Sequence, residues 1–178
     1  MFPTTIVRMF VLGIDPGLSR CGYAVIAPAP GGRGTPVAMG VLRTSPDEET
    51  PVRLAQLHTD LNELLDDFNP VVVSVERIFF QNNVRTAVGV AQASGLALAL
   101  AAGRGIAVAQ YSPNQVKSVV AGDGQAQKGQ VQEMVQALLG LATRPKPADA
   151  ADAAALALCH LAHDPGLRSH SRQPAALR

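Results

Sequence analysis

Short apolar runs alternate along this chain with longer stretches in which an apolar residue recurs every three or four positions. The short runs predict β-strands over residues 10–14, 22–27, 37–44, 71–76 and 107–111. The longer stretches predict helices over residues 51–68, 84–104, 115–120, 130–139 and 149–163. Continuous apolar strands are typical of a sheet that helices cover on both faces. We therefore expect a mixed α/β domain with a central five-stranded sheet and helices on both faces.

The segments between these elements contain turn residues and helix caps. Residues 27–36 (APAPGGRGTP) are rich in Gly and Pro and predict a loop, and residues 122–130 predict a flexible loop that contains Lys128. Asn69 and Pro70 are expected to end the helix before them, and Ser112 is a candidate N-cap. The first three strands then follow one another as an antiparallel meander.

A length of 178 residues suits one domain, which we place at residues 1–163, followed by a flexible basic tail at residues 164–178. Only 4% of the residues are aromatic and none is Trp, so the core must consist mainly of Val, Leu, Ile and Ala. No apolar run reaches the roughly 18 to 20 residues that cross a bilayer. Together with two isolated cysteines, Cys21 and Cys159, this predicts a cytoplasmic protein without a disulfide framework or a membrane anchor.

The charge is distributed unevenly although the net charge is only +1. Residues 1–76 contain nine Asp and Glu against five Lys and Arg, whereas residues 77–178 contain five against ten. A basic surface in the second half would suit a polyanionic partner such as nucleic acid. Within that half, Lys117 and Lys128 are candidate phosphate contacts, although an exposed lysine often serves only solubility.

Two carboxylates stand at the ends of apolar strands. Asp15 follows the first strand and precedes Pro16 and Gly17, and Glu76 ends the fourth strand. If the two strands are neighbours, both carboxylates lie at one edge of the sheet, where α/β proteins build their sites. The alternative for Asp15 is simple turn chemistry, because Asp-Pro-Gly is a common turn sequence.

Asp149 and Asp152 are spaced i, i+3 and therefore share one face of the last helix. They could serve only as an N-cap and a first-turn acid. Taken with Asp15 and Glu76, however, they form a set of oxygen ligands that suits Mg²⁺ or Mn²⁺. Two such ions can support phosphodiester hydrolysis.

Three further features carry candidate roles. Phe79 and Phe80 follow Glu76 and could stack on bases or enter the core. Cys159, His160 and His163 lack the number and spacing of a zinc site. The helix over residues 84–104 is apolar nearly all round, so we expect its outer face to bind a partner.

Five segments together resemble the RuvC family of Holliday-junction resolvases. They are LGIDPGLSRCGYAVI, VSVERIFFQNN, AVGVAQASGLAL, SPNQVKSVVAGDGQAQKGQVQEMV and PADAADAAALALCH. They occur in the order of the family and cover almost the whole chain to about residue 163. The departures are the 28–36 loop, the extended N-terminus and the basic tail, none of which contains the four acids.

This resemblance implies a ribonuclease H-like fold, a homodimer and metal-dependent cleavage of four-way DNA junctions by paired symmetric nicks, in recombination and repair. By position, Asp15, Glu76, Asp149 and Asp152 match the metal ligands, with two Mg²⁺ or Mn²⁺ ions per site. Lys117 and Lys128 match DNA-binding lysines, and Phe79 matches an aromatic placed against the junction. The implied partners are the RuvA and RuvB branch-migration proteins.

Three alternatives remain at this stage. The segment DPGLSRCGYAV also resembles the phosphate loop of actin-like phosphotransferases, but that fold requires two such domains around a nucleotide. A junction-binding protein with weak or no catalysis would bind DNA more easily without the four acids. A ribonuclease H-like nuclease with another substrate, such as an RNA hybrid, would need the same acids.

Overall fold

The computed structural model describes residues 9–78, 84–164 and 166–167. Its elements are β1 (Val11–Asp15), β2 (Arg20–Ala29), β3 (Arg33–Arg43), α1 (Thr50–Phe68), β4 (Val72–Glu76), α2 (Val84–Gly103), β5 (Ala107–Tyr111), α3 (Pro113–Ala121), α4 (Lys128–Leu139) and α5 (Ala148–His163). This order confirms the predicted mixed α/β domain. The predicted cap at Ser112 is confirmed too, since its side chain accepts a hydrogen bond from the Gln115 backbone.

The five strands form one sheet in the order β3-β2-β1-β4-β5. β1 pairs antiparallel with β2 and parallel with β4, and β4 pairs parallel with β5. The expected meander of the first three strands is therefore present. The predicted loop over residues 28–36 is wrong, because β2 and β3 pair through this region and only the turn Pro30–Gly32 interrupts them. Gly31 and Gly32 make this turn tight by adopting φ values of 76° and 74°.

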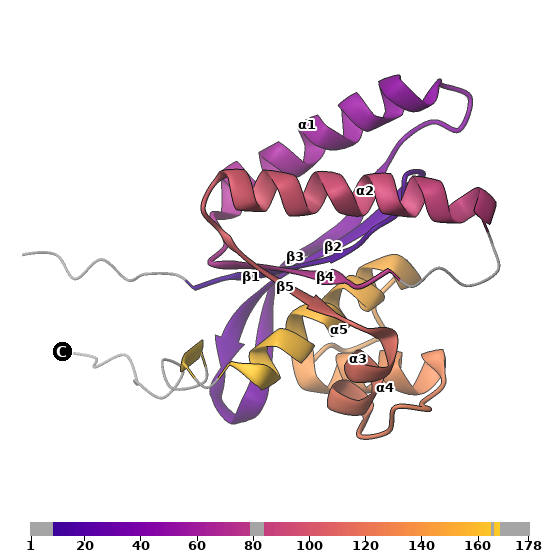
Figure 1. The fold of residues 1–178 in the computed structure, drawn as a ribbon. Coiled ribbons are helices and arrows are strands. Elements are labelled where there is room, and N and C mark those ends of the chain that lie inside the picture. The colour runs from indigo at the N-terminus through magenta and orange to yellow at the C-terminus, as the bar shows by residue number, and fades with distance from the viewer. Residues whose placement is uncertain (1–8, 79–83, 165, 168–178) are drawn as a thin grey trace, which may run out of the picture.

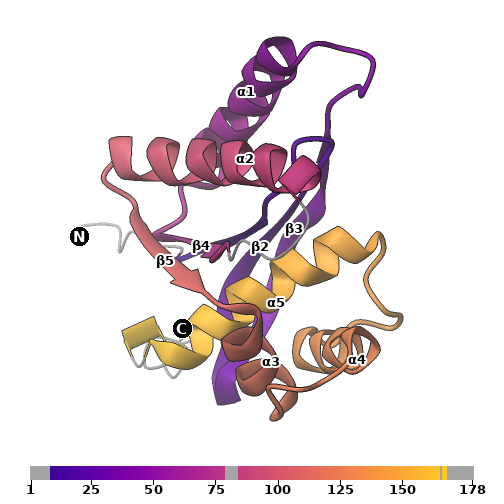
Figure 2. The same ribbon diagram turned by 45° about the vertical axis from the view of Figure 1, so that its right-hand side comes forward.

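Two layers of helices cover the sheet, as Figures 1 and 2 show: α1 and α2 lie on one face and α3, α4 and α5 on the other. Alternate residues of β1 enter the two cores. Leu12 and Ile14 pack with α1 and α2, whereas Val11 packs with the α3, α4 and α5 side. The side chains of Cys21 and Cys159 are both buried, and neither forms a disulfide bond.

Two predicted boundaries differ from the structure. Lys128 is the first residue of α4 and does not lie in the preceding loop. Leu167 is only 5% exposed and packs in the α5 core, so packing continues past the expected boundary at residue 163. Residues 168–178 of the predicted tail lie outside the described part of the chain. No helix among the described residues is long and apolar enough to cross a membrane.

Candidate active site

The strand geometry directs Asp15 and Glu76 to the same side of the sheet. Their strands are parallel neighbours, with Ile14 opposite Val75 in the register. Ile14 and Val75 face α1 and α2, so the next residue of each strand, an acid in both cases, faces α5. Ser74, two residues before Glu76, confirms this alternation, because its hydroxyl donates a hydrogen bond to the carbonyl of Leu156 in α5 at 2.9 Å.

Two glycines allow α5 to lie directly on the strands. A Cβ at Gly13 would stand 2.0 Å from the Ala153 carbonyl oxygen, and one at Gly22 would stand 2.1 Å from the Asp149 carbonyl oxygen. Any side chain at either position would therefore push the helix away. This close approach places Asp149 and Asp152, in the first turns of α5, beside the end of β1. The N-cap of α5 is Pro147, so the alternative in which Asp149 is the cap is wrong.

All four predicted acids line one pocket of about 480 Å³ at this edge of the sheet. Lys117, from α3, and Lys128, from α4, line the same pocket. The apolar part of its wall comes from α3, α4 and α5, at Pro113, Val116, Val131, Ala155 and Leu156. Five separate segments of the chain thus contribute polar groups to one site.

The acids repel one another strongly. Burial, together with repulsion from Asp152, Glu76 and Asp149, raises the pKa of Asp15 to about 7, against an ordinary value of 3.8. Burial and repulsion from Asp152 also raise the pKa of Glu76, and Lys128 partly opposes this shift. Asp15 interacts with all three other carboxylates, so it lies at the electrostatic centre of the site.

Two cations engage the helix acids. Arg20, at the start of β2, donates from Nε to Asp149 at 2.9 Å, and Lys128 donates to Asp152 at 2.5 Å. The hydrogen bond to Asp152 raises the pKa of Lys128, although burial partly opposes this. In this arrangement, no group of three or more His, Cys, Asp or Glu side chains in the described segments is close enough to hold a metal ion.

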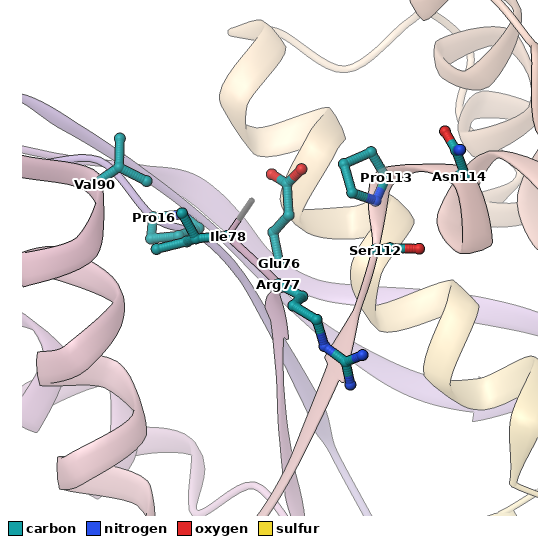
Figure 3. Close-up of a pocket in the computed structure, with 8 residues that line it drawn as sticks. All are labelled: Pro16, Glu76, Arg77, Ile78, Val90, Ser112, Pro113 and Asn114. Atoms are coloured by element: carbon teal, nitrogen blue, oxygen red, sulfur yellow. The ribbon is translucent and has the colours of Figure 1, made fainter. Parts of the chain in front are cut away.

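A second pocket of about 560 Å³ adjoins the first and shares Glu76 and Pro113 with it. Figure 3 shows that Glu76 and Arg77 point in opposite directions from the end of β4. Arg77 is exposed and forms no ion pair with Glu76. Pro16, in the turn after Asp15, closes another side of this pocket. Phe79 and Phe80 lie outside the described residues.

The Cys159, His160 and His163 group serves packing and hydrogen bonding. The Tyr111 hydroxyl lies 2.8 Å from His160 Nδ1, and the Tyr111 ring stacks on His163 with centroids 5.1 Å apart. Burial lowers the pKa of His160. These contacts join β5 to α5 on the face of the sheet that carries the acids.

Arg20 is the residue of the site that sequence reasoning missed. It stands five residues after Asp15, in the second strand of the hairpin, and nothing in its own neighbourhood indicates a partner 129 residues away. The close approach of α5 to β2 at Gly22 brings Asp149 near it, and this approach is a property of the folded chain.

Comparison with known proteins identifies the family. The family model described as "Crossover junction endodeoxyribonuclease RuvC" matches residues 11–160. The chain belongs to the RuvC family. The RuvC of Salinispora arenicola is 52% identical over 153 residues, which are 86% of this chain and 87% of that protein. The RuvC of Streptomyces griseus is 49% identical over 170 residues, or 96% and 83% of the two chains.

Solved RuvC structures have the same architecture. The structure titled "T. thermophilus RuvC in complex with Holliday junction substrate" has a TM-score of 0.83 and 37% sequence identity, and covers 92% of this chain and 97% of that one. A second Thermus thermophilus RuvC structure has a TM-score of 0.81 at 38% identity, covering 87% and 95%. The ribonuclease H-like fold expected from the sequence is thereby confirmed.

Proposed function

We propose that this RuvC family protein is an endodeoxyribonuclease that resolves four-way DNA junctions by paired symmetric nicks, in homologous recombination and DNA repair. The observation that carries the proposal is the convergence of Asp15, Glu76, Asp149 and Asp152 on one pocket that Lys117 and Lys128 also line. Clustered acids beside cations suit the cleavage of a phosphodiester better than the binding of DNA alone. The relatives named above are crossover junction endodeoxyribonucleases.

The four carboxylates fit a pair of Mg²⁺ or Mn²⁺ ions. Oxygen donors are the ligands that these cations prefer. Burial, together with repulsion from neighbouring carboxylates, raises the pKa values of Asp15 and Glu76, and divalent cations bound among these acids would offset the repulsion. When bound, two such ions supply activation of a water and stabilisation of the leaving oxygen. Asp15, Glu76, Asp149 and Asp152 would hold them.

The cations of the chain then bind the substrate. Arg20 and Lys128 bind only the Oδ2 atoms of Asp149 and Asp152 among the described contacts, so the Oδ1 atom of each acid remains available as a metal ligand. Arg20 and Lys128 also lie at the edge of the pocket, where their remaining N–H donors suit phosphate oxygens. Lys117 forms no ion pair within the described chain, so it can contact a phosphate without first leaving an acid. Phe79 and Phe80 are proposed to contact bases of the junction.

The active unit in this proposal is a homodimer, which offers two equivalent sites to a nearly two-fold symmetric junction. The outer face of α2 supports it. Val88, Gly95, Ala99 and Ala102 are exposed and recur every three to seven residues on one side of this helix. Such a smooth apolar face suits a close contact with a second copy of the chain.

We further propose that the protein is cytoplasmic and that RuvA and RuvB are its partners.

A cleavage assay tests the proposed function. A labelled four-way junction, a linear duplex and an RNA–DNA hybrid of the same sequence are incubated with Mg²⁺, with Mn²⁺ or with a chelator. We expect metal-dependent nicks on the junction alone. Cutting of the hybrid or the duplex at a comparable rate would instead favour a ribonuclease H-like nuclease with another substrate.

Asp15→Asn is the matched variant for this assay. The substitution keeps the shape of the side chain but removes the charge at the centre of the acid cluster. We expect cleavage to be lost and junction binding to stay the same or become tighter, as measured by gel shift. Loss of binding with an unchanged fold would show that Asp15 contributes to DNA binding and not to metal binding.

A further inference from the structure

A third pocket, of about 420 Å³, adjoins the turn between β1 and β2. Its wall comes from this turn, from the start of α1 and from α2, at Gly17, Leu18, Ser19, Arg20, Thr50, Arg53, Val88, Gly89, Val90 and Gln92. Arg20 lines this pocket and also binds Asp149 of the acid cluster. The pocket is therefore next to the candidate active site, on the side of α1 and α2, whereas Lys117 and Lys128 approach from α3 and α4.

Arg53 in this pocket is held by hydroxyl groups and not by an acid. Its Nε donates to Thr44 Oγ1 at 3.0 Å, and one terminal nitrogen donates to Ser19 Oγ. Thr44 is 8% exposed, and its own hydroxyl donates to the Leu18 carbonyl at 2.6 Å. The guanidinium is thus fixed in place on the turn that follows Asp15.

The positive charge of Arg53 has no negative partner in the described part of the chain. Arg20, Arg104 and Arg144 each pair with a carboxylate. Arg33, Arg43 and Arg77 form no ion pair but are exposed to solvent. Among the arginines whose side chains the structure describes, which excludes Arg85, Arg53 is the one that is half-buried, oriented by hydrogen bonds and not neutralised. Its other terminal nitrogen, Nη1, has no hydrogen-bond partner among the described residues and can donate to a ligand.

We propose that Arg53, Ser19 and Arg20 form a phosphate subsite, which binds the backbone of the DNA strand next to the phosphate that is cut. A planar guanidinium with free donors matches a phosphate, and the hydroxyl of Ser19 is a further donor. The subsite holds the strand from the α1 and α2 side while the lysines hold it from the α3 and α4 side. This inference rests on the proposed function, because it requires DNA at the acid cluster.

The first test compares the salt dependence of junction binding in wild type and in Arg53→Gln, with chelator present to prevent cleavage. Removal of one phosphate contact lowers the slope of log K against log salt by about 0.9. Arg33→Gln is the matched control, since it removes the same charge from an exposed position at the far end of the β2–β3 hairpin. We expect the slope to fall in Arg53→Gln and to stay at the wild-type value in Arg33→Gln.

The second test replaces single phosphates near the cut by uncharged methylphosphonates. At one position, the replacement should weaken binding of the wild type by roughly tenfold or more. The same replacement should have little effect on Arg53→Gln, because the contact is already absent. The Ser19→Ala variant, changed at an exposed position, should lose part of the wild-type sensitivity to replacement of the same phosphate.

A purely positioning role of Arg53 would give a different result. Thr44→Val removes the hydroxyl that orients Arg53 and Leu18 but leaves every charge in place. If Arg53→Gln and Thr44→Val both lowered cleavage while the salt slope and every methylphosphonate effect stayed as in wild type, the subsite would be refuted. Failure of the wild type itself to bind the junction would instead refute the proposed function.

Discussion

Burial and three neighbouring carboxylates all raise the pKa of Asp15. Together they raise it to about 7. The unfolded chain has no such cluster, so this carboxyl group would ionise near its ordinary value of 3.8. The folded protein therefore stores unfavourable electrostatic energy at its candidate active site, which is common where a site is built to bind cations.

The stability of the metal-free protein should accordingly depend on pH. Between about pH 4 and 7 the folded state keeps the Asp15 proton that the unfolded state has released. Stability then falls as pH rises through this window, by at most about 1.4 kcal/mol per pH unit for this group. We expect the melting temperature in chelator to decrease from pH 5 to pH 8.

Asp15→Asn should flatten this profile and raise the melting temperature at pH 8, at roughly 2–4 °C per kcal/mol for a domain of this size. Glu76, whose pKa is also raised, keeps part of the dependence. Added Mg²⁺ should stabilise the wild type more than Asp15→Asn. A profile that is identical in wild type and variant would show that Asp15 is not under electrostatic strain.

Lys117 and Lys128 both line the acid pocket, but they differ in whether they form an ion pair. Lys128 already binds Asp152, whereas Lys117 has no ion-pair partner among the described residues. We expect Lys117→Ala and Lys128→Ala each to weaken junction binding and to lower the slope of its salt dependence by about 0.9. Arg104→Gln, which removes a charge beyond the far end of α2, should leave the slope unchanged. An unchanged slope in a lysine variant would remove that lysine from the DNA surface.

The apolar pattern predicted the five strands and the five α-helices of the described residues, because periodicity records which face of an element is buried. It failed where backbone pairing needs no apolar side chain. The extension of β2 and β3 through residues 28–36 depends on main-chain hydrogen bonds and on the turn glycines Gly31 and Gly32. The contacts of Gly13 and Gly22 with α5 could not be predicted from the apolar pattern either, because glycine has no side chain that contributes to this pattern.

Helix α2 separates the core from the proposed dimer contact. Ala97 is 3% exposed and belongs to the core beneath the helix, whereas Ala99 is exposed on the opposite side. Ala97→Glu should therefore destabilise the fold, because it buries an unpaired charge. Ala99→Glu should leave the melting temperature of the monomer unchanged but dissociate the dimer in sedimentation experiments. A stable dimer of Ala99→Glu would place the contact elsewhere.

At the scale of the whole molecule, the sequence indicated the four acids but not how they come together. Asp15 and Glu76 could be paired by argument, since parallel neighbouring strands end at one edge. The position of Asp149 and Asp152 beside the other two acids depends on how α5 crosses the sheet. The pairing of Arg20 with Asp149 follows from the same crossing. Such contacts between distant segments are properties of the assembled fold, and local patterns do not encode them.

A supercoiled plasmid that extrudes a cruciform can show whether two identical sites of one dimer cut a junction symmetrically. Paired nicks within one binding event convert such a plasmid directly to the linear form, with ends that a ligase can seal. We predict linear product as the main early species with wild type and Mg²⁺ or Mn²⁺, and none with Asp15→Asn. Accumulation of singly nicked circles ahead of the linear form would show that the two cuts are not paired, and equal cutting of a plasmid without the cruciform would show that the enzyme does not select junctions.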